Sequence, residues 1–224
     1  MVALDISKAF DRVWHASLLS KLPSFGFPPP LCLLISSFLS NRSISAVVDG
    51  ATSSSFAVNC GVPQGSVLSP TLFLLFINDL LTCSSNPIHS YADDSTLHSS
   101  NHFRSAPSLS SRTNAPLQLS NSILADLDRI SRWSRLNLVN FNSLKTQLLN
   151  ISRSKTPLNF PILFDDFNVS PFGNINILGL NINQNLSWKC HVTQVAKRLT
   201  KNWESCSGYA NSFLLLNYFI FINV

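Results

Sequence analysis

The chain has 224 residues, with 16 Lys and Arg against 11 Asp and Glu, and its formal net charge is +5. Only 12% of its residues are charged, where soluble domains average about a quarter, so we expect surface that is covered by other segments. The five cysteines are odd in number and contain no Cys-x-x-Cys pair, which argues against a disulfide framework and a zinc knuckle.

The apolar patterning predicts an α+β fold, in which helices cover one face of a largely antiparallel sheet. The expected helices are 8–22 with Ser7 as N-cap, 31–40, 70–82 with Ser69 as N-cap, and 122–136. The expected strands are 2–6, a hairpin 43–48 and 54–59 around Asp49-Gly50, 138–142 paired with 146–152, a hairpin near 162–170, and 175–183. Residues 99–120, rich in Ser, Asn and Pro, are expected to form a mobile loop.

Asp93 and Asp94 are the most informative candidate site. The loose alternation from Ser90 to His98 predicts a tight hairpin with both acids at or beside its turn. Adjacent like charges repel, so they favour folding only where a cation or a partner offsets them. The alternative is an ordinary turn, which is also how we interpret Asp165-Asp166.

Asp5 is the second candidate. It follows an apolar run, which is typical of a buried strand with a carboxylate at its end. An acid on a strand beside an acidic hairpin can help to gather divalent ions, and two ions about 4 Å apart activate a hydroxyl nucleophile and stabilise a leaving phosphate oxygen. Oxygen ligands favour Mg²⁺ or Mn²⁺ over zinc.

The segment 61–70 has two glycines and two prolines around a polar centre, so we expect an exposed loop of special shape. Ser69-Pro70 then begins a helix with an apolar stripe. A loop that leads into a core helix is the simplest interpretation. It leaves the identities of Gln64 and Gly65 unexplained, because neither residue is expected to gain anything structural from its identity.

Taken together, Leu4–Asp11, Gly61–Ser66 and Tyr91–Asp94 resemble motifs A, B and C of the reverse transcriptases of Jockey-like non-LTR retrotransposons, in the same order and spacing. Further along the chain, 133–146 resembles motif D, 177–182 motif E and 186–191 the entry to the thumb. The resemblance implies a right-hand polymerase palm over 1–157, a primer-grip-like hairpin region over 158–188 and a partial, divergent thumb over 189–224. The fingers would lie before residue 1 and are expected to be missing.

The resemblance also implies roles for single residues. Asp5 and Asp93 would hold two Mg²⁺ ions, for which Mn²⁺ is a possible substitute, and Asp94 would be the third acid. Phe10 would be the steric gate that excludes a ribose 2′-hydroxyl. Gln64 and Gly65 would contact the incoming nucleotide and the template. Tyr91 would pack near the primer terminus, and Lys145 would be the general acid that protonates pyrophosphate. For Lys145, a solvated loop lysine is the alternative.

The implied partners are an RNA template, a DNA primer and deoxynucleoside triphosphates. Lys197, Arg198 and Lys201 share a predicted helix with an apolar face, so they would contact the nucleic-acid backbone; a solvated helix face is the alternative. The apolar run 213–222 is shorter than the about 20 residues of a membrane helix, and we expect no stable membrane association. It is interpreted as a truncated thumb helix or a frame-shifted tail. The expected location is intracellular, in the nucleus or cytoplasm, without secretion.

Two functional hypotheses follow. The first is an RNA-directed DNA polymerase domain that extends a primer 3′-hydroxyl by two-metal nucleotidyl transfer. The second is a non-catalytic, truncated retroelement remnant that at most binds nucleic acid. The three acids, Gln64 and Lys145 favour the first, whereas the missing fingers favour the second.

Overall fold

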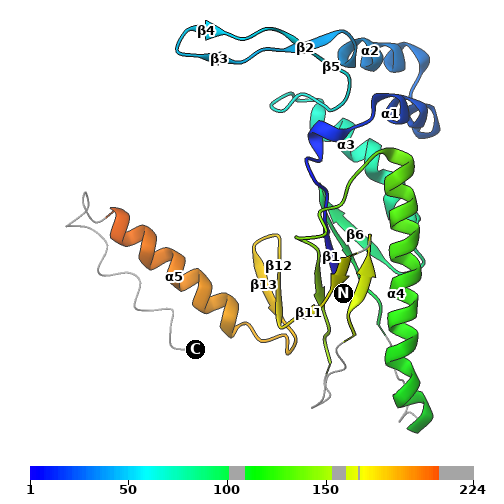
Figure 1. The fold of residues 1–224 in the computed structure, drawn as a ribbon, viewed down its shortest axis with the longest axis vertical. Coiled ribbons are helices and arrows are strands. Elements are labelled where there is room, and N and C mark those ends of the chain that lie inside the picture. Colours follow the sequence, from blue (N-terminus) through cyan, green and yellow to red (C-terminus); the bar gives the residue numbers. More distant parts are fainter. Residues whose placement is uncertain (101–108, 153–159, 166, 207–224) are drawn as a thin grey trace.

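The computed structural model describes residues 1–100, 109–152, 160–165 and 167–206, without the side chains of 109–116 and 201–206. Its centre is a five-stranded sheet in the order β11-β8-β1-β7-β6. The strands are β1 (Val2–Asp5), β6 (Ile88–Tyr91), β7 (Asp94–Leu97), β8 (Gln147–Leu149) and β11 (Pro171–Phe172). All pairs are antiparallel except β11–β8. The fold is therefore α+β, with β1 as the middle strand (Figure 1).

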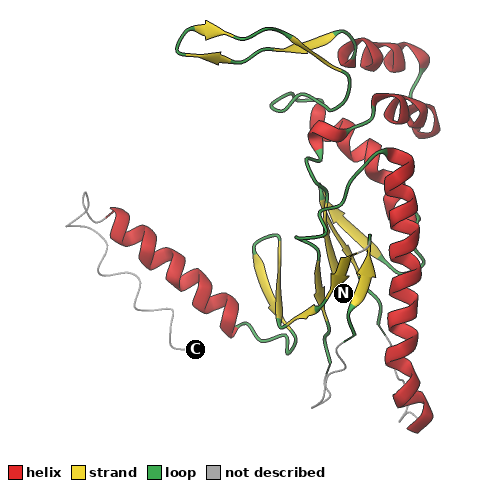
Figure 2. Cartoon of the chain, in the orientation of Figure 1, coloured by secondary structure: helices red, strands yellow, loops and turns green. Residues whose placement is uncertain are grey.

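The described chain also has five helices, of which the first four contribute buried residues to the core. They are α1 (His15–Lys21), α2 (Pro29–Leu39), α3 (Ser69–Ile77), α4 (Leu109–Asn137) and α5 (Lys189–Cys206), with 3-10 turns η1 (Phe10–Arg12), η2 (Leu22–Phe25) and η3 (Asn78–Thr82). The long helix α4 runs beside the sheet, as Figure 2 shows. Its Ile123, Leu127 and Ile130 join Leu4 and Leu97 in one buried cluster. These three residues of α4 lie on its buried face.

Four two-stranded sheets complete the secondary structure of the described residues. β2 (Arg42–Ile44) pairs with β5 (Phe56–Val58), and β3 (Val47–Val48) pairs with β4 (Ala51–Thr52) beyond it. Asp49 and Gly50 have φ angles of 50° and 81°, so the predicted turn is confirmed. β9 (Ile162–Phe164) pairs with β10 (Phe167–Val169), as expected near 162–170, and Asp165 lies between them.

The expected helix over 8–22 is wrong, because it is interrupted after η1. Val13 and Trp14 are extended. The carbonyls of Phe10 and Val13 accept hydrogen bonds from the amides of Val62 and Gly61, each at 2.8 Å, instead of from the next helical turn. Ser7 is not an N-cap either, because Ala9 holds that position before η1. The amide of Ser7 donates to the carbonyl of Asn140 at 2.8 Å.

Other boundaries also differ from expectation. The helix expected from 122 begins at Leu109, so much of the predicted loop 99–120 is helical, and 101–108 lie outside the described residues. Residues 175–183 form two strands, β12 (Asn174–Ile177) and β13 (Leu180–Asn183), because Leu178 and Gly179 turn the chain at φ 49° and 82°.

The segment 138–142 does not pair with 146–152. It forms an isolated bridge between Phe141 and Ile6, while β8 pairs with β1. The amide of Asn142 donates to the carbonyl of Asp5 at 2.8 Å, which extends the contact along the chain that follows β1.

None of the helices in the described part of the chain has the length and apolar content that a membrane crossing needs. The apolar run 213–222, for which we predicted a truncated helix or an altered tail, lies outside the described residues.

Candidate functional site

The candidate acids meet at the end of the two central strands. Asp5 is the register partner of Asp94, and antiparallel partners project from the same face of a sheet. The two-residue turn between β6 and β7 consists of Ala92, at a φ of 52°, and Asp93. The tight acidic hairpin is therefore confirmed, and it brings Asp93 and Asp94 beside the end of β1.

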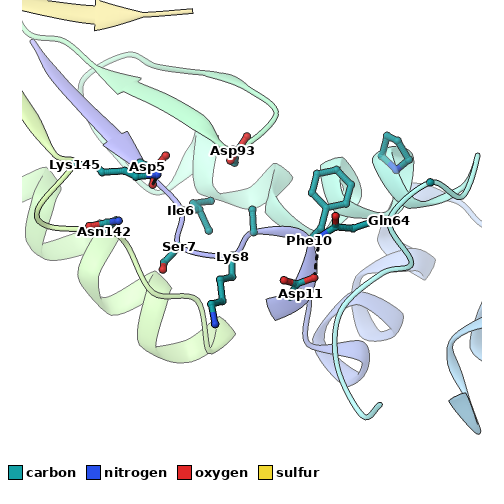
Figure 3. A pocket seen from close by; sticks show the side chains of 13 residues that line it. Asp5, Ile6, Ser7, Lys8, Phe10, Asp11, Gln64, Asp93, Asn142 and Lys145 are labelled. Atoms are coloured by element: carbon teal, nitrogen blue, oxygen red, sulfur yellow. Dashed lines mark hydrogen bonds and ion pairs between the residues drawn. The ribbon is translucent and has the colours of Figure 1, made fainter. Parts of the chain in front are cut away.

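A pocket of about 610 Å³ lies at this edge of the sheet, as Figure 3 shows. Six of the predicted site residues line it, namely Asp5, Phe10, Gln64, Gly65, Asp93 and Lys145. These residues come from β1, η1, the loop 61–68, the β6–β7 turn and the segment before β8. The structure thus gathers residues from all three motifs around one cavity.

Burial and electrostatic repulsion both disfavour the charged form of Asp94 at this edge. Burial and the carboxylates of Asp93 and Asp5 raise the pKa of Asp94, against the opposing effect of Lys145. The ammonium Nζ of Lys145 lies 3.2 Å from Oδ2 of Asp5, and its side chain is 65% exposed. A cation therefore already sits beside the acids, and it is supplied by the protein itself.

The Phe10 ring forms one wall of the pocket. It stacks on Phe73 of α3, with ring centroids 5.0 Å apart and planes 15° apart. Gly61 has a φ of +84°, and a Cβ added there would lie 2.8 Å from the carbonyl oxygen of Asp11. Only glycine allows this approach, so the loop 61–68 is seated directly on η1.

Gln64 and Gly65 occupy the corner of a turn. The amide of Ser66 donates to the carbonyl of Pro63 at 3.2 Å, and Gly65 has a φ of +86°. A positive φ at the third position of such a turn favours glycine. The expectation that Gly65 gains nothing structural is therefore wrong, and Gln64 donates from Nε2 to Oδ1 of Asp11 at 3.1 Å.

Asp94 and two groups of predicted residues are not among those that line the pocket. Tyr91 is the register partner of Asp94, and its side chain is 71% exposed. Lys197 and Arg198 are exposed on α5, which stands apart from the sheet (Figure 1). Lys201 belongs to the same helix, and its side chain is outside the described set. The apolar face of α5 is also exposed, with Val192 at 61% and Leu199 at 56%.

Sequence reasoning missed further residues that line the pocket, among them Lys8, Asp11 and Asn142. Lys8 has a left-handed backbone with a φ of 53°. The carbonyl of Asn142 accepts the amides of Lys145 and Thr146, both at 3.0 Å, and so shapes the turn that carries Lys145. Asp11 directly follows Phe10, a predicted site residue, which is the one signal that could have identified it.

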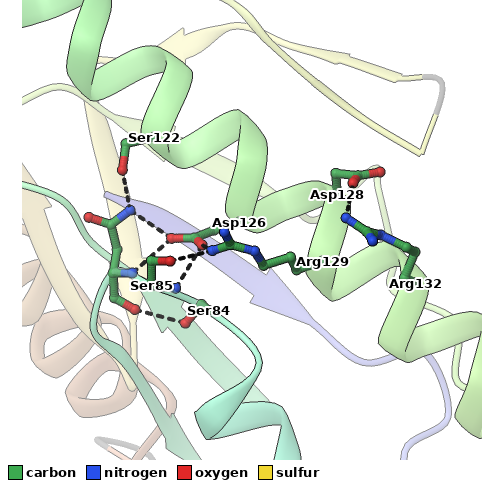
Figure 4. A network of polar contacts seen from close by, with 8 residues as sticks. Ser84, Ser85, Ser122, Asp126, Asp128, Arg129 and Arg132 are labelled. Atoms are coloured by element: carbon green, nitrogen blue, oxygen red, sulfur yellow. Dashed lines mark hydrogen bonds and ion pairs between the residues drawn. The ribbon is translucent and has the colours of Figure 1, made fainter.

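A second network, missed as well, anchors the other end of the acidic hairpin (Figure 4). Asp126 of α4 has a side chain with 0% exposure, and it accepts the amides of Ser85 and Asn86 at 2.8 and 2.9 Å. It also accepts from Nδ2 of Asn86 and from Arg129, each at 2.6 Å. Burial alone would raise the pKa of Asp126, but these donors outweigh it and hold the pKa below its usual value.

The donor chemistry of the edge fits a hard divalent cation, because Asp5, Asp93 and Asp94 offer carboxylate oxygens whose repulsion a cation would relieve. Within the described ranges, no three His, Cys, Asp or Glu side chains converge as a ready metal-binding group. The acids are thus close enough to influence one another, without already being gathered as ligands.

Comparisons with known proteins agree with this geometry. The family model described as reverse transcriptase (RNA-dependent DNA polymerase) matches residues 1–182. The chain is 30% identical over 193 residues to the RNA-directed DNA polymerase from mobile element jockey of Drosophila melanogaster, covering 86% of this chain and 20% of that protein.

It is also 30% identical over 197 residues to the probable RNA-directed DNA polymerase from transposon X-element of the same species, covering 88% and 21%. A match of 37% over 82 residues joins it to the Pol polyprotein from type-1 retrotransposable element R2 of Popillia japonica, covering 37% and 14%. The chain spans about a fifth of the length of the first two relatives. It belongs to the reverse transcriptase family.

Proposed function

We propose that the chain is the RNA-directed DNA polymerase domain of a non-LTR retrotransposon, which extends a primer 3′-hydroxyl along an RNA template. One observation carries the proposal. Asp5 and Asp94 are register partners at the end of the central strands, with Asp93 in the adjoining turn, and this edge shares one pocket with Phe10 and Gln64.

In the proposed reaction, Asp5 and Asp93 hold two Mg²⁺ ions and Asp94 assists. Bound there, the ions would supply activation of the attacking hydroxyl and neutralisation of the leaving oxygen, and Mn²⁺ is a possible substitute. Lys145 neutralises Asp5 in the free protein, at 3.2 Å. Because its side chain is largely exposed, it can leave Asp5 and donate a proton to pyrophosphate, which is the general-acid role.

The pocket walls would select the substrate. Phe10 is held by its stack on Phe73, so its ring cannot easily retreat from a ribose 2′-hydroxyl, and deoxynucleotides are favoured. Gln64 and Gly65 would meet the nucleotide and the template from the loop 61–68, which is hydrogen-bonded to the Phe10 backbone. Tyr91, which pairs with Asp94, would lie near the primer terminus.

The outer elements would guide the nucleic acid. We infer that 1–157 form the palm, that 158–188 with the β12–β13 hairpin act as the primer grip, and that α5 begins the thumb. The exposed Lys197 and Arg198, with Lys201, would contact phosphates and make binding weaker at high salt.

Primer extension with Mg²⁺ on matched RNA and DNA templates tests the function. We expect synthesis by the wild type, its loss in Asp93→Ala, and its retention in Asp49→Asn, which removes a carboxylate from the tip of a distant hairpin. If a folded wild type binds template–primer but never extends it, the chain is the non-catalytic remnant instead.

A further inference from the structure

We propose that Asp11 is a positioning residue, which turns the Gln64 amide so that its oxygen, and not its nitrogen, meets the nucleotide or template. This inference rests on the proposed function and adds a residue and a hydrogen-bond polarity to it. The key contact joins Gln64 Nε2 to Asp11 Oδ1 at 3.1 Å, and in Figure 3 the amide oxygen points away from Asp11.

The backbone of Asp11 is fixed relative to the loop 61–68. Val62 donates to the carbonyl of Phe10 and Gly61 to that of Val13, both at 2.8 Å, so the loop is bonded on both sides of Asp11. The absent side chain of Gly61 lets the two backbones touch at Asp11 itself. The carboxylate is therefore presented at a defined place beside the loop.

The backbone of Gln64 is fixed as well. It lies in the turn closed by Ser66 and Pro63, and the hydroxyl of Ser69 donates to the carbonyl of Pro63 at 2.6 Å. The freedom that remains is in the Gln64 side chain, which is exposed. The contact with Asp11 is the side-chain hydrogen bond that restrains it.

The chemistry of the pair decides the orientation of the amide. An ionised carboxylate only accepts hydrogen bonds, whereas an amide has a donating nitrogen and an accepting oxygen. Asp11 therefore takes the nitrogen and leaves Oε1 of Gln64 as an acceptor. No donor within the described part of the chain bonds to that oxygen. It fits a sugar hydroxyl or a base amino group.

Equilibrium binding tests this without catalysis. A template–primer whose primer ends in a dideoxynucleotide cannot be extended, so the affinity for the next nucleotide can be measured with Mg²⁺ by fluorescence anisotropy of the labelled duplex. Asp11→Asn lets the residue donate, and the Gln64 amide can then turn around. We expect affinity to fall about five-fold, the effect of one hydrogen bond. Both side chains are exposed, so folding should not change.

A swap gives the sharper readout. Gln64→Glu places two carboxylates together and should weaken binding, whereas Asp11→Asn with Gln64→Glu restores a donor–acceptor pair and should recover binding to within about two-fold of the wild type. Gln64→Glu with Asp49→Asn has the same net charge but should not recover. Comparing RNA with DNA templates tests whether a template 2′-hydroxyl donates to Oε1 of Gln64, and comparing deoxy with dideoxy nucleotides tests the 3′-hydroxyl of the nucleotide. If Asp11→Asn lowers the affinity equally in both comparisons, the donor is a base amino group.

The assignment of Asp11 would be overturned if wild type and Asp11→Asn bound the nucleotide with equal affinity. It would also be overturned if Asp49→Asn restored binding in Gln64→Glu as well as Asp11→Asn does. Failure of the wild type to bind any nucleotide on the duplex would overturn the proposed function instead. The side-chain amide resonances of Gln64 provide a check in the free protein, since they should move in Asp11→Asn and stay in Asp49→Asn.

Discussion

Two acids of α4, two residues apart, provide a stability experiment with an internal control. Asp126 and Asp128 each pair with an arginine, Arg129 and Arg132 respectively. The Asp126 carboxylate has 0% exposure and accepts two backbone amides, while both side chains of the Asp128 pair are 62% exposed. Asp126→Ala and Asp128→Ala should therefore differ strongly, although they make the same chemical change.

Asp126→Ala leaves the amides of Ser85 and Asn86 without their acceptor in two partly buried hydrogen bonds, and a hydrogen bond to a charged group contributes about 1.5–3 kcal/mol. Arg129 is 41% exposed and can return to water, so we expect a total loss of about 3 kcal/mol. Asp128→Ala should cost about 0.5 kcal/mol at most, as exposed pairs do. Urea denaturation at pH 7 measures both, and similar losses would refute the reasoning.

The pH dependence of the same pair is a second readout. Because its donors hold the pKa of Asp126 below the ordinary value in the folded state, its contribution is complete above the unfolded carboxyl pKa of about 3.9. It is lost as the pH falls through the lower, folded pKa. The gap between wild type and Asp126→Ala should narrow only in strong acid, and a gap that already closes near pH 6 would contradict this sign.

Three further predictions follow from the site. Gly61→Ala should lower the free energy of urea unfolding by about 1–3 kcal/mol, because Gly61 has a φ of +84° and an added Cβ would clash with the backbone of Asp11. Gly173→Ala, at a position with open space around it, should lower it by under about 1 kcal/mol. Equal losses in the two variants would contradict this reasoning. Asp94→Asn should stabilise the protein by up to about 0.5 kcal/mol at pH 7 and not at pH 3. The reason is that the pKa of Asp94 is raised in the folded state, so the free energy of unfolding of the wild type falls as the pH rises through that pKa. A variant that is less stable than the wild type at pH 7 would count against carboxylate repulsion. Phe10→Val should raise the use of ribonucleotides relative to deoxynucleotides in a competition assay, and an unchanged ratio would remove Phe10 as the gate.

Residues whose structure depends on their neighbours in sequence were predictable. The Asp93 turn, the Asp49-Gly50 turn and the buried strand before Asp5 each follow from alternation and turn chemistry within a few residues. Neighbouring residues alone do not predict that Asp5 lies beside the acidic hairpin. That prediction came from the order of the three motifs in the sequence. These local signals were sufficient for the acidic edge and the α+β class.

Features set by distant partners were not predictable. The helical spacing after Ser7 is real, but the loop amides of Gly61 and Val62 take the carbonyls that a continuous helix would use. The sequence around Asp126 is that of an ordinary exposed helix, and its burial results from contact with the distant segment Ser85–Asn86, which donates hydrogen bonds to it. The bond between Gln64 and Asp11 likewise joins residues that are 53 positions apart.

The central place of β1 also has a consequence for biosynthesis. Its partners β7 and β8 begin at Asp94 and Gln147, so the strand has left the ribosome long before either neighbour is made. At roughly 5–20 residues per second, Val2 and Leu4 wait on the order of ten seconds without the strands that bury them. Nascent β1 is therefore a natural target for chaperones, and slow codons before Asp94 should lower the yield of folded protein.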